Sequence, residues 1–363
     1  MNKITFIAQF PPPIHGLSKA VETLWLSELQ NKYVFEKIDI TNNKSILKNL
    51  IAIMHSKSDL SYFTISQTKA GNWRDLAILK LLGWKKKNCL IHLHGGYYRT
   101  LIDEDCGAFQ QKLNYQALKK VAGCIVLGNS LIPIFKGLID DSKIYIVPNC
   151  VDNDYLADTD DLTKKLDNVE KQNQLHILYL SNFIETKGYK NVLSLALVAK
   201  EKQEKRIHFH FAGKFFREEE KNYFHSFIEQ NSLSDYVTYH GVVSGQSKID
   251  LLNLCHIFIL LTRYPNEGQP ISILEAMANG MAIVTTNHAG IPDIVTDGKN
   301  GLVVDKNGID LAHIFSYFID ILKDNNLLKT TGTINCQTAM ECYTEKQYIT
   351  NIDKIFEKLC HQK

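Results

Sequence analysis

Short apolar segments alternate with longer amphipathic segments along most of the chain. The short runs are bounded by Gly, Pro, Asn or Asp and predict buried strands, whereas the longer segments have the spacing of helices. Strands are predicted at 4–10, 34–40, 60–65, 89–93, 123–127, 143–147, 175–180, 207–212, 236–239, 257–261, 281–285 and 302–304. Helices are predicted at 17–29, from 45, 73–82, 109–121, from 130, 189–200, 218–230, 248–254, 271–278, from 310 and from 345. This alternation predicts α/β architecture with doubly wound, mainly parallel sheets.

The length of 363 residues suits two such domains of ordinary size. A polar stretch at 153–174, rich in Asp, Lys and Gln, is the predicted connection between them. We therefore expect a first domain at 1–165, a second at 170–340 and a terminal helix at 341–363. Two D-x-D triplets, at 152–154 and 158–160, lie in this polar region, and we interpret them as solvated acids.

The hydrophobic content of 45% and charged content of 22% are typical of a soluble globular protein. No apolar run reaches the roughly 18 residues that a membrane-spanning helix needs. The apolar start of the chain is soon interrupted by prolines 11–13, so it predicts a first strand and not a signal peptide. The eight cysteines form no C-x-x-C pair, which favours reduced thiols in a cytosolic protein over disulfides or zinc.

Positive charge is concentrated in the first part of the chain. Residues 1–150 contain 19 Lys and Arg against 11 Asp and Glu, whereas the remainder contains 22 against 28. This asymmetry predicts an anionic partner, and since no nucleic-acid motif is present we expect an anionic membrane surface. Trp84 with Lys85–Lys87 is one candidate docking segment, although a solvated loop, or lysines that only keep the domain soluble, explains the same pattern.

The stretch from Asn266 to Gly301 carries the most specific chemistry. A Gly-containing loop, Asn266–Pro270, precedes the predicted helix at 271–278, and Pro270 suits the first helical position. Backbone N–H groups at such a helix start bind phosphate well. The carboxylates of Glu267 and Glu275 flank this point, where they suit sugar hydroxyls and not phosphate. The combination predicts a nucleotide diphosphate sugar, and the alternative is an amphipathic helix with two incidental acids.

With the turns at 290–293 and 297–301, this stretch resembles the donor-site signature of the retaining family 4 glycosyltransferases. The resemblance is strongest over 175–305 and weaker over 4–20 and 90–150. It implies the GT-B fold, in which two Rossmann-like domains face a central cleft and the last helix crosses back to the first domain. It also implies a transfer with retention of anomeric configuration, without metal, cofactor or protein nucleophile.

The resemblance also implies roles for individual residues. Glu267 would hold the hydroxyls of the donor sugar and Glu275 those of the ribose. The loop at 181–188 resembles the phosphate loop of the family, in which an Arg and a Lys bracket the donor pyrophosphate. Lys187 matches that Lys, but Asn182 occupies the position of the Arg. Arg263 is our candidate for the missing cation, with an ordinary surface arginine as the alternative. The remaining donor-binding candidates around the helix start are Gly268, Gln269, Pro270 and Ile271.

Three further positions match the family pattern. Gly16 follows the first predicted strand and a Pro-rich loop, without a G-x-G-x-x-G pattern. His94 ends a predicted strand, on the same face as His92, and resembles the family's histidine over the donor sugar. Zinc binding by the two histidines is the alternative, but no third ligand has suitable spacing. Gly241 and Val242 match the place where the backbone meets the nucleotide base.

From these features we expect a glycosyltransferase that moves a hexose or N-acetylhexosamine from a UDP-sugar or related donor. His94, Lys187 and Glu267 are the expected catalytic residues. The expected acceptor is a lipid-linked oligosaccharide of O-antigen or capsule synthesis, with the enzyme cytoplasmic and peripheral on the inner face of the membrane. The alternatives are an enzyme with a soluble acceptor, a catalytically silent sugar-nucleotide-binding protein, and an epimerase of a nucleotide sugar.

Overall fold

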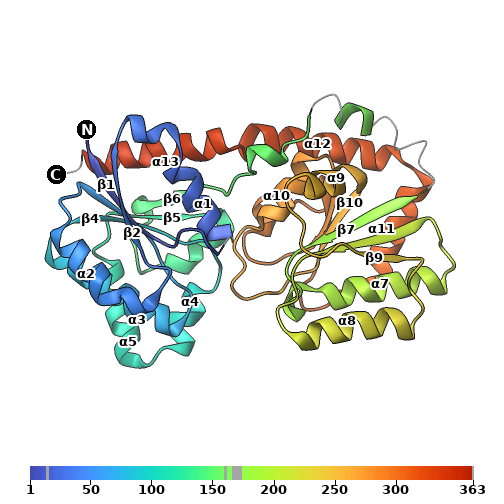
Figure 1. Ribbon diagram of the computed structural model, residues 1–363, viewed down its shortest axis with the longest axis horizontal. Coiled ribbons are helices and arrows are strands. Elements are labelled where there is room, and N and C mark those ends of the chain that lie inside the picture. Colours follow the sequence, from blue (N-terminus) through green and yellow to red (C-terminus); the bar gives the residue numbers. More distant parts are fainter. Residues whose placement is uncertain (14–15, 159–161, 166–173, 362–363) are drawn as a thin grey trace. The chain divides into compact units, whose positions relative to one another are not determined.

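The computed structural model describes residues 1–13, 16–158, 162–165 and 174–361. The chain divides into two compact units. Unit 1 comprises Met1–Cys150, Asn266–Gln269 and Glu345–Lys363, and unit 2 comprises Val151–Pro265 and Pro270–Thr344. Each unit contains a six-stranded parallel sheet (Figure 1), which confirms the predicted α/β class. The predicted connection at 153–174 lies partly outside the described residues, as does Asp160 of the second D-x-D triplet, and the predicted domain boundaries stay predictions.

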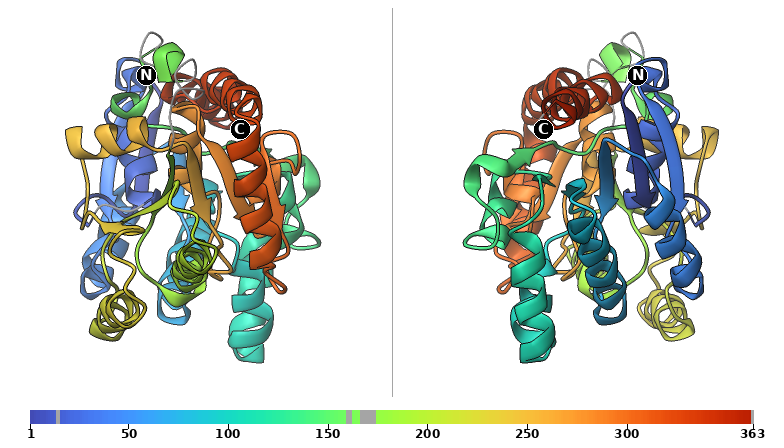
Figure 2. Two further views of the ribbon diagram at one scale, coloured as in Figure 1. Left: turned by 90° about the vertical axis from the view of Figure 1, so that its right-hand side faces the viewer. Right: turned by 90° about the vertical axis from the view of Figure 1, so that its left-hand side faces the viewer.

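The sheet of unit 1 has the strand order β2-β1-β3-β4-β5-β6. Its strands are β1 Lys3–Ala8, β2 Val34–Asp39, β3 Leu60–Thr64, β4 Asn88–His92, β5 Gly123–Val126 and β6 Ile144–Ile146. Its longer helices are α1 Gly16–Trp25, α2 Ile46–His55, α3 Lys69–Trp84, α5 Ala108–Leu118 and α13 Glu345–Cys360. The right-handed connections between parallel strands place α2, α3 and α5 on one face of the sheet. In the right panel of Figure 2 they lie side by side, coloured blue to teal.

The last helix, α13, returns to unit 1 and packs on the other face of its sheet. Phe356 of this helix makes edge-on ring contacts with Phe6 of β1 and Tyr62 of β3, at centroid distances of 6.3 and 5.9 Å. Ile352 and Leu359 are buried in the same core. The predicted crossing of the terminal helix back to the first domain is therefore confirmed.

The sheet of unit 2 has the strand order β12-β11-β10-β7-β8-β9. Its strands are β7 Leu175–Leu180, β8 Ile207–Ala212, β9 Val237–Tyr239, β10 Ile257–Leu260, β11 Ala282–Thr286 and β12 Gly301–Val304. Its helices of eight residues or more are α7 Tyr189–Glu201, α8 Glu218–Gln230, α9 Gln246–Leu254, α10 Ile271–Ala278, α11 Leu311–Lys323 and α12 Asn326–Cys342. Every residue of the neighbouring inner strands β10 and β11 is buried, as expected of a parallel sheet that helices cover on both faces.

Two of the differences from the prediction have a clear physical reason. The helix expected from residue 130 is a 3-10 helix, Asn129–Phe135, because Pro133 inside it lacks the N–H that an α-helix would need. Helix α12 was not predicted, since its face toward the core includes the polar residues Thr331 and Asn335.

None of the eight cysteines, all of which lie among the described residues, forms a disulfide. Four of them are buried: Cys89, Cys124, Cys150 and Cys255. In the described ranges no helix combines the length and the apolar character that crossing a membrane requires.

Five histidines gather on one face of the unit 2 sheet: His176, His208, His210, His240 and His256. The rings of His176, His210 and His240 form a chain of two hydrogen bonds, each 2.9 Å between ring nitrogens. The backbone N–H of His176 donates to the ring Nδ1 of His256 at 3.0 Å. Burial lowers the pKa of His210 and that of His256 to about 3. Both rings are therefore neutral near pH 7, where they serve as hydrogen-bonding groups of the sheet.

This cluster predicts that unit 2 loses stability as the pH falls below about 6.5, the ordinary pKa of histidine. The unfolded chain then binds protons that the folded chain excludes, at about 1.4 kcal/mol per pH unit for each such histidine. We expect the urea concentration at the unfolding midpoint of unit 2 to decrease when the pH is lowered from about 7 to about 5.5. The decrease should be smaller in the His210→Gln variant. A midpoint that is independent of pH in this range would contradict the neutral state of the two rings.

Candidate functional site

The carboxyl ends of the unit 2 strands carry most of the predicted donor-binding residues. Strands β7 and β10 are neighbours, and the chain proceeds in opposite directions across the sheet from them, to β8 and β9 on one side and to β11 and β12 on the other. Ligands of open α/β sheets bind at such a switch point. The loops after the two strands are joined here, because the N–H of Arg263 donates to the carbonyl oxygen of Thr186 at 2.7 Å.

The loop after β7 fixes the position of Lys187. Gly188 follows it with a φ of +83°, and a Cβ atom at Gly188 would lie 2.3 Å from the carbonyl oxygen of Leu261. Only glycine suits this close approach. The ammonium of Lys187 lies 5.3 Å from the centroid of the Tyr264 ring, within reach of a cation–π interaction. The structure thus places a lysine at the switch point, next to the loop that carries Arg263.

Asn182 occupies the position where the resemblance expects an Arg, and Arg263 is the candidate that would replace its charge. Both side chains are exposed. The carbonyl oxygen of Asn182 accepts from the N–H of Ile184 at 2.9 Å, so the loop turns tightly here. A hydrogen bond from Lys190, 2.7 Å away, lowers the pKa of Glu185, and the charge of Arg263 contributes in the same direction. The charge of Arg263 therefore reaches the loop at 181–188, and its role as the substitute cation stays a prediction.

Helix α10 spans the predicted residues, with Pro270 one position earlier than expected, at the N-cap. Glu275 is buried, and its Oε1 accepts from Nζ of Lys248 in α9 at 2.7 Å. The same ammonium lies 3.8 Å from the centroid of the Tyr155 ring. Glu275 is therefore one partner of a largely buried ion pair. The sequence did not predict this pair, because Lys248 has the position of an ordinary polar residue in an amphipathic helix.

Gly241 and Val242 follow β9 at the same edge of the sheet. Gly241 has a φ of +70°, and its carbonyl oxygen accepts from the N–H of Gly213 at 2.7 Å. The side chain of Val242 is 71% exposed. The contact of these two residues with a nucleotide base stays a prediction.

In unit 1, His92 and His94 lie at the carboxyl end of β4 on one face, as the alternation predicts. Their ring centroids are 3.9 Å apart. His92 is fully buried, and its Nδ1 is 2.7 Å from the hydroxyl of Tyr62. Burial, followed by the proximity of His94, lowers the pKa of His92 well below its usual value. His92 thus supports the ring of His94 as a neutral group.

The segment Asn266–Gln269 packs against His94 and Gly95 by close backbone contacts. A Cβ atom on Gly268 would lie 2.5 Å from the carbonyl oxygen of His94, and one on Gly95 would lie 2.6 Å from that of Asn266. Two glycines are needed because neither position has room for a side chain. Glu267, which is 8% exposed, lies in this segment between the two contacts. The structure therefore brings the loop of Glu267 to the strand end of His94.

Two other predicted site residues of unit 1 are Gln269 and Gly16, and Gln269 forms hydrogen bonds within the fold. Oε1 of Gln269 accepts from the N–H of Asn149 at 2.7 Å, and Nδ2 of Asn149 donates to the carbonyl oxygen of Gln269 at 2.8 Å. The Gln269 carboxamide thus ties the segment to the end of unit 1, and its donor-binding role stays a prediction. Gly16 is exposed at the start of α1, while Ile14 and His15, just before it, lie outside the described residues.

The Gly268→Ala variant tests the close contact with His94. Its Cβ atom would force the loop away from β4, and such overpacking costs about 1–3 kcal/mol. We expect a lower melting temperature and a weaker affinity for the nucleotide sugar. Gly308→Ala is the control, since an added Cβ there meets nothing within 4 Å. Equal melting temperatures and affinities for the two variants would contradict the contact.

Sequence reasoning missed His288, whose Nε2 is 2.7 Å from the carbonyl oxygen of Tyr264. His288 thus supports the loop of Arg263 and Tyr264, and no motif singled it out. In the part of the chain that the structure describes, no three His, Cys, Asp or Glu side chains are placed to hold a metal ion. The side chain of Asp152, in the first D-x-D triplet, accepts from the N–H of Asp154 and caps a short 3-10 helix.

The second part of the chain matches the model of a known protein family. Residues 160–335, somewhat less than half of the chain, match the family model described as "Glycosyl transferases group 1". The whole chain is also similar to a solved structure, Alr3699/HepE of Anabaena in complex with UDP, with a TM-score of 0.75. That match covers 99% of this chain and 100% of the other at 13% identity, so it identifies the fold alone. The second part of the chain is thus similar to group 1 glycosyltransferases, and the predicted GT-B fold is confirmed.

Several curated relatives are named as glycosyltransferases. The chain is 25% identical to the uncharacterized glycosyltransferase MJ1069 of Methanocaldococcus jannaschii, over 78% of this chain and 71% of that protein. It is 36% identical to the putative colanic acid biosynthesis glycosyltransferase WcaL of Salmonella typhimurium, over 22% of this chain and 21% of that protein. It is 29% identical to N,N'-diacetylbacillosaminyl-diphospho-undecaprenol alpha-1,3-N-acetylgalactosaminyltransferase of Campylobacter jejuni, over 33% of this chain and 31% of that protein.

Proposed function

We propose that this protein is a retaining, family 4 glycosyltransferase that transfers a hexose or N-acetylhexosamine from a UDP-sugar. The observation that carries the proposal is the junction of two loops at the switch point of unit 2, where Lys187 and Arg263 follow neighbouring strands. Cations and backbone N–H groups at such an edge suit a diphosphate. This junction lies within the residues that match the group 1 family.

The proposed roles follow from the chemistry of each side chain. Lys187, with Arg263, stabilises the charge that develops on the leaving diphosphate, and stabilisation of this kind is usually the largest catalytic contribution. Glu267 accepts hydrogen bonds from the donor sugar, and Glu275 accepts them from the ribose. His94 contacts the sugar and the incoming acceptor. No residue forms a covalent bond to the sugar: the acceptor oxygen bonds the anomeric carbon on the face from which the diphosphate leaves, and its proton passes to the diphosphate.

We propose a lipid-linked oligosaccharide as the acceptor, in the synthesis of a cell-surface polysaccharide such as O-antigen or capsule. Two observations support this finer assignment. One relative carries undecaprenol in its name and another colanic acid biosynthesis. The first 150 residues are rich in Lys and Arg, as expected of a protein that works at an anionic membrane surface. In this proposal the protein is cytoplasmic and peripheral on the inner face of the membrane, and neither metal nor another cofactor takes part.

A transfer assay tests the proposed function. The purified full chain is incubated with UDP-sugars and lipid-linked acceptors in the presence of EDTA, and both UDP release and the glycosylated product are followed. The proposal predicts acceptor-dependent release of UDP and a product that keeps the anomeric configuration of the donor. Transfer to soluble sugars alone would overturn the lipid acceptor, and epimerisation of the donor without acceptor would overturn the transferase.

Asn182 favours a second candidate, a catalytically silent protein that binds sugar nucleotides. An asparagine at this position supplies no charge to the phosphate loop, so the diphosphate has one cation fewer there. Affinity for UDP together with neither transfer nor donor hydrolysis would favour this alternative.

A further inference from the structure

Large apolar side chains of unit 1 are exposed mainly on three neighbouring helices, α2, α3 and α5. These helices cover one face of the sheet and lie side by side (Figures 1 and 2). The exposed residues are Leu47, Ile51, Met54, Trp73, Trp84 and Phe109, with exposed fractions of 46–75%. We call the outer surface of the three helices the α2–α3–α5 face. Exposed apolar residues that gather in this way mark an interaction surface.

The charges on this face have one sign. The segments 40–58, 76–102 and 106–139, which contain α2, most of α3 and all of α5, include no Asp or Glu. The single acid on the three helices, Asp75, is buried and pairs with Arg74 at 2.8 Å. The exposed lysines on or beside the helices include Lys80, Lys112, Lys119 and Lys120. The face thus combines apolar side chains with exposed charges that are all positive on the three helices themselves, which fits an anionic and amphiphilic partner.

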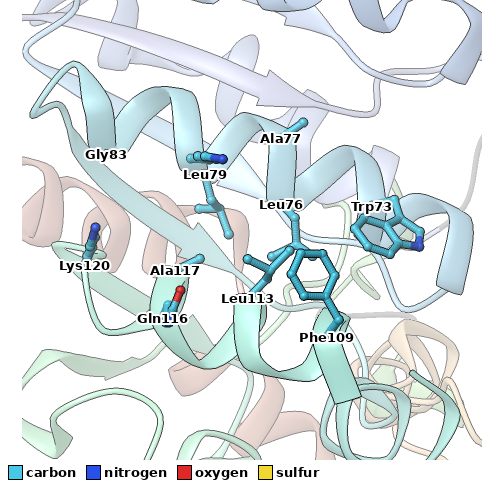
Figure 3. Close-up of a pocket in the computed structure, with 11 residues that line it drawn as sticks. Trp73, Leu76, Ala77, Leu79, Gly83, Phe109, Leu113, Gln116, Ala117 and Lys120 are labelled. Atoms are coloured by element: carbon cyan, nitrogen blue, oxygen red, sulfur yellow. The ribbon is translucent and has the colours of Figure 1, made fainter. Parts of the chain in front are cut away.

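Between α3 and α5 the face contains a groove with a volume of about 470 Å³. This volume lies within the usual range of ligand pockets, about 300–1,000 Å³. Its floor and walls are mainly apolar, with Leu76, Leu113 and Ala117 among the lining residues. Figure 3 shows Trp73 and Phe109 at one end of the groove, and their ring centroids are 6.5 Å apart.

The opposite end of the groove is basic. Lys120 lies there beside Gly83 (Figure 3), and Lys80 is a further lining residue of the groove. A Cβ atom on Gly83 would lie 3.8 Å from Cδ of Lys120, so the lysine stem runs along the α3 wall. The groove therefore offers apolar contacts along its length and the ammonium group of Lys120 at one end. This distribution matches a hydrocarbon chain that carries an anionic headgroup.

A buried polar network fixes the spacing of the two helices that form the groove. Nδ2 of Asn72 in α3 donates to Oδ1 of Asn114 in α5 at 2.8 Å, and Nε2 of Gln110 donates to Oδ1 of Asn72, also at 2.8 Å. These directional bonds hold α3 and α5 in one register. The groove is thus part of the folded scaffold, independent of any flexible loop.

In the segment after α3, by contrast, two of the three lysines form hydrogen bonds within the fold. The ammonium of Lys85 donates to the carbonyl oxygens of Ile53 and Ser56 at the end of α2, and that of Lys87 donates to the carbonyl oxygen of Ser58. Only one of the three lysines after Trp84, Lys86, is exposed. The predicted docking segment thus contributes mainly its tryptophan, and the other exposed lysines lie on or beside α2, α3 and α5.

We propose that the α2–α3–α5 face docks on the surface of an anionic lipid bilayer, and that the α3–α5 groove takes a hydrocarbon chain of one lipid. Amphipathic aromatic side chains such as Trp73 suit the boundary between headgroups and chains, and lysines suit anionic headgroups. The inference rests on the proposed function, in which the acceptor is lipid-linked, and it assigns the surface that brings the protein to that acceptor. It concerns the bilayer itself and needs no catalytic residue.

Vesicle flotation of the full-length protein tests the inference. The vesicles contain phosphatidylcholine alone, or phosphatidylcholine with about one quarter phosphatidylglycerol. The groove variants are Trp73→Ser with Phe109→Ser and, separately, Lys80→Glu with Lys120→Glu. The matched control is Phe216→Ser with Lys202→Glu, which makes the same kinds of change at exposed residues of unit 2.

We expect the wild-type protein and the control to bind the anionic vesicles, and each groove variant to bind at least about 10-fold more weakly. High salt should weaken wild-type binding, and brominated lipid chains should quench tryptophan fluorescence less in the Trp73→Ser variant. Equal binding of groove variants and control, or failure of the wild type to prefer anionic vesicles, would overturn the proposal. A wild-type dimer that the groove variants break would overturn it in favour of a second copy of the chain.

A separate measurement distinguishes failure of this inference from failure of the proposed function. Calorimetric titration of the groove variants with UDP should give the wild-type affinity, because none of the changed residues belongs to the predicted donor site. Vesicle binding without UDP affinity would retain the docking surface and remove the transferase. UDP affinity without vesicle binding would retain the donor site and remove the docking surface.

Discussion

Replacing Lys187 by alanine is expected to weaken the binding of the donor's nucleoside diphosphate about 10- to 100-fold. Hydrogen bonds to charged groups contribute about 1.5–3 kcal/mol, and each 1.4 kcal/mol is a tenfold change in affinity. The loss should be large here because Asn182 supplies no charge to the same loop. Calorimetric titration of the variant with the diphosphate measures the effect, and turnover should fall further, since charge on the leaving group grows in the transition state.

Lys202→Ala is the matched control, an exposed lysine at the other end of α7. We expect it to bind the diphosphate as the wild type does. Arg263→Ala should show a loss smaller than that of Lys187→Ala if Arg263 acts as the second cation. Wild-type affinity in the Lys187→Ala variant, with an unchanged melting temperature, would contradict the assignment of the phosphate loop.

Replacing Glu275 by alanine is expected to reduce both nucleotide affinity and stability. The substitution leaves the ammonium of Lys248 largely buried without its carboxylate partner, 2.7 Å away. Removing one partner of a buried ion pair costs about 3–5 kcal/mol. For a domain of this size, each kcal/mol lowers the melting temperature by about 2–4 °C. Thermal unfolding and nucleotide titration of the variant therefore measure two separate roles of one side chain.

A second substitution separates these roles. In the Glu275→Ala, Lys248→Met double variant no buried charge is left over, so most of the lost stability should return. Nucleotide affinity should stay low, because the carboxylate that holds the ribose is still missing. Recovery of affinity together with stability would show that Glu275 acts only through the fold.

Much of the architecture follows from local sequence patterns. The bounds predicted for β7, β8, α8 and α10 agree with the structure, because in each case a regular hydrophobic pattern ends at residues that favour turns or caps. Helix α12 could not be predicted in this way. The amide of its buried Asn335 donates to the carbonyl oxygens of Met281 and Asn300, each at 2.8 Å. Those partners are distant in the sequence, so no local pattern predicts that Asn335 is buried.

The candidate site likewise has some features that local sequence patterns predict and others that depend on contacts between distant residues. The loop, helix and turn around Glu267 and Glu275 are visible in the sequence because glycine and proline mark their ends. The ion pair of Glu275 with Lys248 joins residues 27 positions apart, and the contact of Gly268 with His94 joins two distant segments. Such contacts depend on how the sheets order their strands. Sequence patterns predict the candidate residues, and the structure adds the groups that hold them in place.

The most direct test of the central claim is a calorimetric titration of the purified protein with UDP, GDP and ADP, each with and without EDTA. Our account predicts that one of the three, UDP, binds tightly and that EDTA does not change its affinity. Such a result would establish the donor class and the independence from metal together. Absence of binding by all three diphosphates would contradict the account, and binding that EDTA abolishes would contradict its metal-free site.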